Sequence, residues 1–463
     1  MALSNFVMPA LPSPTSWFPG HMKKFTRMLP SLLTRTDVVL EIRDSRLPLT
    51  SINRTLEGAL RKWRLERGWD PNDPSKRIVS VQACEHIVVF NKRDLVPSWG
   101  MEPFYKAMEK KFPHQRLLFA SWHRSRDIRT LNDILVNIAK QHPHALELNV
   151  LVIGMPNVGK STLLNTLRHQ GIKGHTAKAF QTSANPGMTQ ALSTRLKLSV
   201  EPPIYAYDSP GVMLPYLGRG TEGAERGVKL ALIAGIKEGL YDMEALAGYL
   251  LYRLNVLNPI SPVYLDLLPK GAQPTTELTE FLTQLGHRMG MLKKRGEVDL
   301  TRAAVYFVRW WREEGGLLAA KGSFHQIHHQ QKPAPRPTTA IPTPPPPASG
   351  PTDEGSTAAG GALRAAQSEP LVSTNTSLVV GGNAPKVEGW GFDFQWALQE
   401  AADLEKRSTA PQLFLQEKME VCIDQYLEMI DREEREEMNI SPTQIKKRQV
   451  MEEKQRRRMR YNK

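Results

Sequence analysis

Apolar runs bounded by polar residues predict buried parallel strands in the first half of the chain. They lie at residues 37–42, 86–90, 148–153 and 204–207. Segments with helical periodicity lie between them, at residues 102–112 and 130–141. This alternation is typical of βαβ units and predicts a doubly wound α/β fold with a mostly parallel sheet. We expect this α/β domain to span residues 17–217.

From about residue 222 the pattern changes to amphipathic helices alone. Helices are predicted over 228–234, after an N-cap at Asp242, after an N-cap at Thr276, and from Leu300 to Trp311. These segments predict a small all-α domain over residues 218–320.

Residues 327–388 are rich in Pro, Gly, Ser and Thr. Such a composition cannot bury enough apolar surface to fold, so we expect a disordered linker. Residues 389–463 are predicted to form a helical, basic extension, with one apolar stripe at Met419, Cys422, Ile423, Tyr426, Leu427 and Ile430. A basic amphipathic helix suits RNA, a membrane surface or a partner helix, and we favour RNA for its end.

Composition narrows the classes of partner and compartment. The chain has 61 Lys and Arg against 47 Asp and Glu, and its formal net charge of +14 favours an RNA or anionic-membrane partner. Its two cysteines, Cys84 and Cys422, argue against a disulfide framework and a thiolate zinc site. No apolar run approaches the ~20 residues that span a bilayer. Residues 1–16 are a candidate targeting segment, because no acidic residue precedes Asp37, although they contain no Lys or Arg.

A phosphate-binding loop is predicted between a strand and a helix. Residues 154–161 read GMPNVGKS, which matches the pattern G-x-x-x-x-G-K-[ST] at every fixed position. Glycines let the backbone N–H groups wrap a phosphate at the helix N-terminus, while the Lys reaches the β- and γ-phosphates. The alternative is a Gly-rich turn without a ligand. The predicted phosphate-binding residues are Asn157, Val158, Gly159, Lys160, Ser161 and Thr162.

A guanine-binding loop is predicted at residues 91–94, which read NKRD after a strand. The Asp94 carboxylate can accept both the ring N–H and the exocyclic NH₂ of guanine, a donor pair that adenine lacks. Asn91 can bond the other edge of the purine, and the stem of Lys92 can lie over the ring. Ser121 lies in a segment expected to close over the base through backbone groups. The alternative is an ordinary polar loop after a buried strand.

Residues that bind Mg²⁺ are predicted on both sides of the phosphate loop in sequence. The Ser161 hydroxyl and Asp208 are expected to hold the ion, and the Gly211 N–H to contact the γ-phosphate. Thr189, in the segment 185–189 that reads NPGMT, is expected to close onto Mg²⁺ with triphosphate bound, and a plain Pro-Gly turn is the alternative. Many GTPases carry a water-orienting Gln after this glycine, where Val212 stands here.

The guanine motif precedes the phosphate loop, the reverse of the order in ordinary GTPases. Residues 17–22 read WFPGHM, and residues 43–48 read RDSRLP. With these motifs, residues 17–315 resemble the circularly permuted GTPases that assist ribosome assembly, in the subgroup that acts on the large subunit, and most closely its mitochondrial members. The resemblance implies a GTP hydrolase that uses Mg²⁺, binds large-subunit rRNA and leaves after hydrolysis. The Pro-rich linker and the basic tail fall outside it.

The resemblance also implies roles for single residues. His21 would organise the hydrolytic water, which fits the absence of a Gln; a packing or RNA-contacting His is the alternative. Asn157 would help to hold K⁺, and an Asn chosen for loop geometry is the alternative. Basic residues of the helical domain are candidate rRNA contacts, with an ordinary charged surface as the alternative: Arg288, Lys293, Lys294, Arg295, Arg302, Arg309 and Arg312.

These observations predict a protein of the mitochondrial matrix, with peripheral contact to the inner membrane as a further candidate feature and no stable homo-oligomer. Two other functions remain open on sequence alone. The first is a nuclear or cytosolic assembly GTPase of a sister subgroup, and the second is a non-hydrolysing RNA-binding scaffold.

Overall fold

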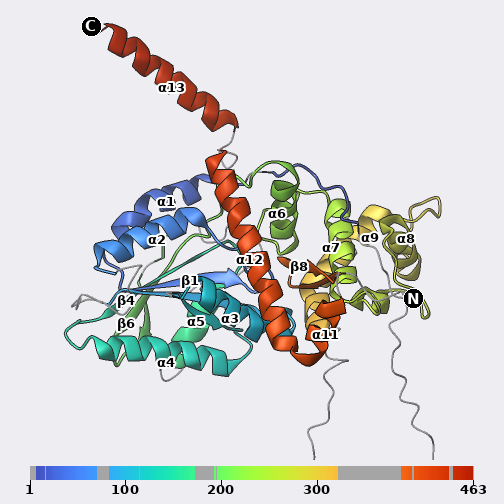
Figure 1. The fold of residues 1–463 in the computed structure, drawn as a ribbon, viewed down its shortest axis with the longest axis horizontal. Coiled ribbons are helices and arrows are strands. Elements are labelled where there is room, and N and C mark those ends of the chain that lie inside the picture. The colour runs from blue at the N-terminus through green and yellow to red at the C-terminus, as the bar shows by residue number, and fades with distance from the viewer. Residues whose placement is uncertain are drawn as a thin grey trace, which may run out of the picture.

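The computed structural model describes residues 7–15, 17–69, 83–113, 115–172, 192–193, 195–321, 387–398, 401–436 and 442–461. An α/β domain carries a helical domain on one side, and a long C-terminal helix runs across the front of both (Figure 1). Most of the predicted linker and the predicted switch residue Thr189 lie outside the described residues.

A six-stranded sheet forms the centre of the α/β domain, in the order β3-β2-β1-β4-β6-β5. All neighbouring strands pair in parallel except β5 and β6, which are antiparallel. The strands are β1 (Val38–Asp44), β2 (Glu85–Asn91), β3 (Arg116–Phe119), β4 (Leu148–Gly154), β5 (Leu196–Ser199) and β6 (Ile204–Asp208). The predicted fold class is therefore confirmed.

Helices cover both faces of this sheet because the side chains of each strand alternate between the faces. The apolar residues of α4 and α5 pack with Val38, Leu40 and Ile42 of β1. On the other face, Val39 packs with α1 and α2, and β2 packs with α3. The helices are α1 (Gly20–Leu33), α2 (Arg54–Glu66), α3 (Met101–Lys111), α4 (Ser125–Gln141) and α5 (Lys160–Gly171).

The helical domain follows β6 as the sequence pattern predicts. It contains α6 (Gly220–Leu232), α7 (Met243–Leu257), α8 (Leu278–Arg288), α9 (Leu300–Trp310), a π-helical turn (Trp311–Gly315) and α10 (Gly316–Lys321). Asp242 caps α7 as predicted, because its carboxylate accepts the Ala245 N–H at 3.0 Å. Thr276 does not cap α8: Glu277 occupies the N-cap position, and the hydroxyl of Thr275 accepts the Glu277 N–H.

The C-terminal extension differs from the predicted helical tail because it begins with a β-hairpin. The hairpin of β7 (Val387–Trp390) and β8 (Phe394–Ala397) packs with β2, α3 and the long helix α12 in one apolar cluster. The remaining helices are α11 (Ala401–Thr409), α12 (Pro411–Arg435) and α13 (Pro442–Tyr461). Among the described helices, none has the length and apolar character needed to cross a membrane.

Candidate functional site

The described residues of the predicted phosphate and guanine loops, together with Asp208, lie at one edge of the sheet because parallel strands end there together. In the strand register, Asp44 at the end of β1 lies beside Asn91 at the end of β2. Gly154, where the phosphate loop begins, lies beside Ile42 of β1, and Asp208 at the end of β6 pairs with Val152. Ligands of open α/β sheets bind at the carboxyl ends of the strands, so this edge is the candidate nucleotide site.

Gly159 has the backbone conformation that the phosphate loop needs. Its φ of 92° favours glycine, and a Cβ here would lie 2.5 Å from the Asn91 Nδ2 atom. Asn91 occupies that space and donates from Nδ2 to the Val158 carbonyl at 2.8 Å. The phosphate loop and the guanine loop are therefore tied together by a side chain predicted for guanine binding. Among the described residues, the buried Asn91 Oδ1 atom has no hydrogen-bond partner.

Lys160 is buried at the start of α5 and its ammonium turns back onto the loop. Its Nζ donates to the Met155 carbonyl at 2.7 Å and to the Gly154 carbonyl at 3.3 Å. Burial lowers the pKa of Lys160 to about 8, an effect that the nearby Asp208 opposes. A phosphate in the loop would replace these two carbonyls with a charged partner for the ammonium.

The two predicted Mg²⁺ ligands with described positions are in direct contact. The Ser161 hydroxyl donates to Asp208 Oδ2 at 2.5 Å, whereas Asp208 Oδ1 is buried without a partner among the described residues. Burial raises the pKa of Asp208, and Lys160 opposes that rise. A hydroxyl and a carboxylate with an unmatched oxygen fit the oxygen-donor preference of Mg²⁺.

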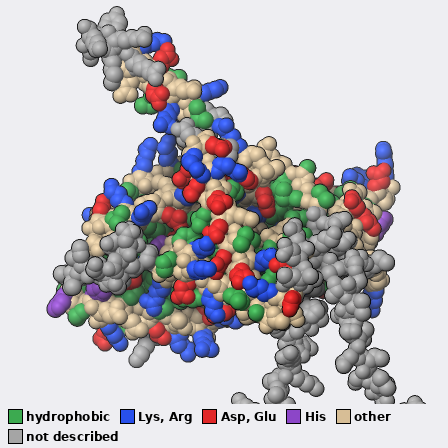
Figure 2. Space-filling view, viewed as in Figure 1, with side chains coloured by type: hydrophobic (Ala, Val, Ile, Leu, Met, Phe, Trp, Pro, Cys, Tyr) green, Lys and Arg blue, Asp and Glu red, His purple; other side chains and the backbone are tan. Residues whose placement is uncertain are grey.

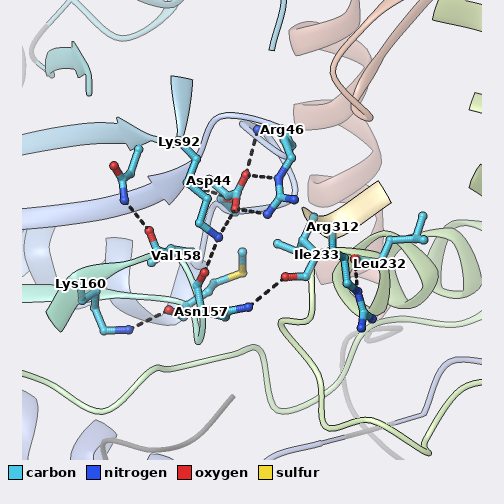
Figure 3. Close-up of polar contacts among 12 residues, drawn as sticks. Asp44, Arg46, Lys92, Asn157, Val158, Lys160, Leu232, Ile233 and Arg312 are labelled. Carbon is cyan, nitrogen blue, oxygen red and sulfur yellow. Dashed lines mark hydrogen bonds and ion pairs between the residues drawn. The ribbon is translucent and has the colours of Figure 1, made fainter. Parts of the chain in front are cut away.

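Lys92 links the guanine loop to the phosphate loop through a buried ion pair (Figure 3). Its Nζ donates to the Asn157 carbonyl at 2.5 Å and lies 3.1 Å from Asp44 Oδ2. Asp44 also accepts two bonds from the Arg46 guanidinium, at 2.9 and 2.8 Å. Desolvation favours the neutral form of Asp44, but Arg46 and Lys92 hold its pKa well below the usual range. Within the RDSRLP motif, Asp44 therefore positions Lys92 and Arg46 holds Asp44, a role that the motif alone did not indicate.

The loop after β3 lies against the guanine loop. The Arg93 N–H donates to the Ala120 carbonyl at 3.1 Å, and the neighbouring Ser121 is fully buried. The Ser121 N–H donates to Asp127 at 3.1 Å, which fixes the turn. Asp94 Oδ1 is buried and has no partner among the described residues. A buried carboxylate oxygen without a partner fits a site that accepts N–H groups from a base.

The segment after Asp208 packs tightly against the phosphate loop. At Gly211 a Cβ would lie 2.6 Å from the backbone of Pro156, so only glycine allows this approach. The next residue, Val212, donates its N–H to the Gly154 carbonyl at 3.0 Å and accepts a bond from Asn53 Nδ2 at 3.2 Å. Asn53 also caps α2, and sequence reasoning did not single it out.

His21 lies on α1, one turn before Phe25. Phe25 and Val212 belong to the same apolar cluster, which brings α1 next to the segment that follows Asp208. His21 Nε2 is buried without a partner among the described residues, and burial lowers the pKa of the imidazole. A neutral imidazole can accept a proton from water, whereas the side chain of Val212 cannot.

Comparisons with known proteins agree with this geometry. Residues 149–249 match the family model described as "50S ribosome-binding GTPase". The chain is 29% identical to Mitochondrial GTPase 1 of Schizosaccharomyces japonicus, over 64% of this chain and 87% of that protein. It is 30% identical to Mitochondrial ribosome-associated GTPase 1 of Mus musculus, over 52% of this chain and 66% of that protein. The chain is a circularly permuted GTPase.

Among solved structures, the GTPase resembles GNP-bound YlqF from T. maritima at 20% sequence identity. That match covers 65% of this chain and 95% of the other, with a TM-score of 0.37.

The phosphate loop of the GTPase also contacts the helical domain directly. Asn157, with a φ of 58°, donates from Nδ2 to the Ile233 carbonyl at the end of α6 at 3.2 Å. Arg312 donates to the carbonyls of Ala231 and Leu232 at 2.9 and 3.0 Å, so it holds the same helix end (Figure 3). The amide oxygen of Asn157 is the atom left to accept a cation. A conformational change in the phosphate loop would therefore reach the helical domain directly, through the bond from Asn157 to the Ile233 carbonyl.

The predicted RNA contacts of the GTPase divide into two groups. Lys293, Lys294 and Arg295 are exposed in the turn between α8 and α9, and Arg302 and Arg309 are exposed on α9. By contrast, the Arg288 guanidinium donates to the carbonyls of Asp266 and Leu268, and the Arg312 guanidinium donates to those of Ala231 and Leu232. Arg288 and Arg312 thus have partners within the protein.

Proposed function

We propose that this GTPase binds the large subunit of the mitochondrial ribosome in its GTP state, assists its assembly and leaves after hydrolysis. The names of the relatives in fungi and mouse support a mitochondrial site of action, and the family description supports a ribosomal client. The observation that carries the proposal is the contact between Asn157 and Ile233, because it joins the phosphate loop to the helical domain. Loss of the γ-phosphate would then change the surface that carries the exposed basic turn.

In this proposal each group of site residues has one task. Asn91, Lys92, Asp94 and Ser121 bind guanine, and residues 157–162 with Gly211 bind the phosphates. Ser161, Asp208 and Thr189 hold Mg²⁺, which supplies positive charge beside the phosphate oxygens when bound. The amide oxygen of Asn157 is the candidate ligand for K⁺. Lys293, Lys294, Arg295 and Arg302 contact rRNA phosphates, and the protein acts in the matrix as a monomer.

His21 is the proposed group that orients the attacking water. The support is its position on α1 beside the cluster that contains Val212, together with a buried and unmatched ring nitrogen. Replacing His21 with Ala should lower subunit-stimulated turnover by at least about a hundredfold, the low side of the usual range for a general base. The affinity for GTP should stay unchanged. Single-turnover hydrolysis measures the first quantity and nucleotide titration the second; unaltered turnover would assign catalysis to another residue.

The proposed client is tested by sedimentation of the full chain with purified large subunits. Mitochondrial and cytosolic subunits are each mixed with protein and a non-hydrolysable GTP analogue, GDP or no nucleotide. We expect co-migration with mitochondrial subunits in the analogue state alone. Binding to cytosolic subunits instead would favour a sister assembly GTPase. Binding that ignores the nucleotide, without stimulated turnover, would favour a non-hydrolysing RNA-binding scaffold.

A further inference from the structure

The last helix, α13, stands away from the body of the protein. It begins beyond α12 and projects from the molecule, with Lys and Arg side chains along its described part (Figures 1 and 2). Val450 and Met451 are 51% and 71% exposed. At 1.5 Å per residue, this 20-residue helix is about 30 Å long. A helix this exposed gains little stability from packing onto its own chain, so its side chains are available to bind another molecule.

Basic residues outnumber acidic residues along α13. The helix contains eight Lys or Arg residues and two Glu residues. The helical period places four basic residues within a sector of about 100°. Glu453 borders this sector and pairs with Arg457 at 2.6 Å, whereas Glu452 lies on another side of the helix and pairs with Arg448 at 3.5 Å. We call this sector the basic stripe: Lys446, Lys447, Lys454 and Arg457, all of them exposed. A row of cations matches a row of phosphates better than a point-like anion.

The apolar side chains that the structure describes in α13 argue against a lipid or a helical partner. Ile445, Val450 and Met451 lie on three different sides of the helix, separated by about 100° or more. A helix that lies in a membrane interface or joins a coiled coil needs a continuous apolar stripe. Charge without such a stripe favours a nucleic-acid backbone.

The end of α12 that precedes α13 in sequence is anchored to the body of the protein. The Glu433 carboxylate lies 3.2 Å from Arg226 of α6, and both side chains are buried. The Arg54 guanidinium at the start of α2 donates to the Ile430 carbonyl at 3.0 Å and pairs with Glu434 at 2.5 Å.

Helix α1, which packs on α2, exposes further cations and no acidic residue at its solvent face: Lys23, Lys24 and Arg27. In the view of Figure 1, α1 lies at the same end of the molecule as the base of α13.

We propose that α13 is a second RNA-binding surface, separate from the helical domain, that lays its basic stripe along the phosphate backbone of duplex RNA. The proposal deepens the proposed function and rests on it for the source of that RNA, the large-subunit rRNA. Because the stripe contacts phosphates, binding is independent of base sequence and weakens with salt. The helical domain and α13 then bind the same ribosomal subunit at two places, which raises the overall affinity through avidity.

The test measures the affinity of the full chain for a synthetic RNA duplex by fluorescence anisotropy over a range of salt concentrations. In the neutralised variant, the four stripe residues become Gln: Lys446→Gln, Lys447→Gln, Lys454→Gln and Arg457→Gln. We expect the slope of log affinity against log salt to fall by about 3 to 4, near one for each phosphate contact. Affinity near 0.1 M salt should fall at least about tenfold.

Two matched variants control for charge and folding. Exchanging Lys for Arg and Arg for Lys at the same four positions keeps the charge and should keep the affinity. Glu452→Gln removes an acidic residue from the same helix and should tighten binding. Gln is a good helix former, so circular dichroism and thermal unfolding should show no change in any variant.

The outcomes separate this proposal from the proposed function. Unchanged affinity and salt slope in the neutralised variant would overturn the role of α13, even if the wild-type protein still sediments with mitochondrial subunits in the analogue state. Conversely, a loss of duplex affinity would support the RNA-binding surface even if the subunits failed to bind. Binding to vesicles with anionic lipid but not to RNA would reassign the stripe to a membrane surface and overturn the proposal.

Discussion

Several side chains of the nucleotide site each join two parts of the chain. Asn91 bonds the phosphate loop, although its position at the end of β2 predicts a guanine contact. Lys92 bonds both Asp44 of β1 and the carbonyl of Asn157. Asn53 caps α2 and also holds the carbonyl of Val212. The site is therefore preorganised through shared residues, and a substitution at any of these positions affects two loops together.

Asp94→Asn should change the base that the site prefers. The carboxylate accepts two N–H groups of guanine, whereas an amide presents NH₂ to the C2 carbonyl of xanthine. A hydrogen bond to a charged group contributes about 1.5–3 kcal/mol, so GTP affinity should fall roughly tenfold to a hundredfold. Xanthosine triphosphate should bind better than it does to the wild-type protein. Competition titration with both nucleotides measures this, and unaltered GTP affinity would contradict the guanine assignment.

Nucleotide affinity should depend on pH through Lys160. Burial lowers the pKa of Lys160 to about 8 from its ordinary 10.5, so the ammonium of the free protein loses its proton as the pH rises through 8. Bound phosphate favours the charged form, which means that binding above pH 8 takes up a proton. Affinity for GDP should be flat below pH 8 and fall by up to about tenfold per pH unit above it.

Lys160→Arg provides the control for that measurement, because a guanidinium keeps its charge across this range. The titration of the guanine base itself affects both proteins equally. Calorimetric titration between pH 6.5 and 9 should therefore show the steeper loss in the wild-type protein, whatever the absolute affinity of the variant. Parallel curves for the two proteins would show that Lys160 stays charged in the free state.

Local motifs predicted most residues of the candidate nucleotide site, because the residues of each motif lie close together in the sequence. Residues 154–161 and 91–94 form loops between a strand and a helix, and the strand register brings them together. Asn53 carries no such signal, because its partner Val212 lies 159 residues away. Asp44 lies in the motif at residues 43–48, but the motif does not indicate its contact with Lys92, which comes from another strand end. Contacts between distant segments follow from the tertiary fold, which a local pattern does not encode.

At the scale of the elements, the hairpin β7–β8 is an integral part of the GTPase domain. Trp390 is fully buried, stacks on Phe104 at 5.4 Å between ring centroids and donates from Nε1 to the Pro97 carbonyl at 2.9 Å. Pro97 follows the guanine loop, and α3 carries Phe104. The hairpin also bonds the helical domain, because Arg253 of α7 donates to the carbonyls of Gly391 and Phe394.

Trp390→Ala should destabilise the protein strongly. Removal of a buried Trp typically costs about 3–5 kcal/mol, and here the Pro97 carbonyl also loses its donor. GTP affinity should fall as well, because Trp390 supports the segment after the guanine loop. Urea unfolding and nucleotide titration measure the two effects. The control is Leu413→Ala on α12, which is 50% exposed and should change stability by less than about 0.5 kcal/mol. Equal stability of the two variants would contradict this role of Trp390.

The sequence predicted the buried face of α12 but not what that face touches. The stripe from Met419 to Ile430 has helical spacing, and Met419, Ile423 and Ile430 are buried as that spacing predicts. Its partner α3 is separated from it by about three hundred residues, including a segment whose composition favours disorder. The hairpin was missed because it is short and directly follows that segment.

At the scale of the whole molecule, the C-terminal extension joins the two domains. Asp393, in the turn of the hairpin, accepts the N–H groups of Leu49 and Thr50 at 2.8 Å each and pairs with Lys229 of α6 at 3.3 Å. Farther along, Glu433 of α12 pairs with Arg226, also of α6. The extension thus contacts three parts of the molecule: the segment after the guanine loop, the loop after β1 and the helical domain.

Two truncations should therefore differ in their effect on stability. A chain that ends at residue 386 loses Trp390 and Phe394, which contact Phe104, and exposes an apolar face of α3, so it should aggregate or unfold at a lower temperature. A chain that ends at residue 436 loses α13 alone and should keep its unfolding temperature and GTP affinity. Size-exclusion chromatography and thermal unfolding of both chains test this. A stable, soluble chain ending at residue 386 would show that the extension is dispensable for the fold.

The strand order also has a consequence for how the chain folds during its synthesis. Strand β1 is made first, yet it needs β2 on one edge and β4 on the other. Until residues 148–154 have been made, the β1 edge that pairs with β4 remains unpaired, and such an edge invites pairing with other chains. The apolar face of α3 waits longer still, until residues 387–423 cover it. The nascent protein therefore remains open to aggregation until almost its whole length has left the ribosome that makes it.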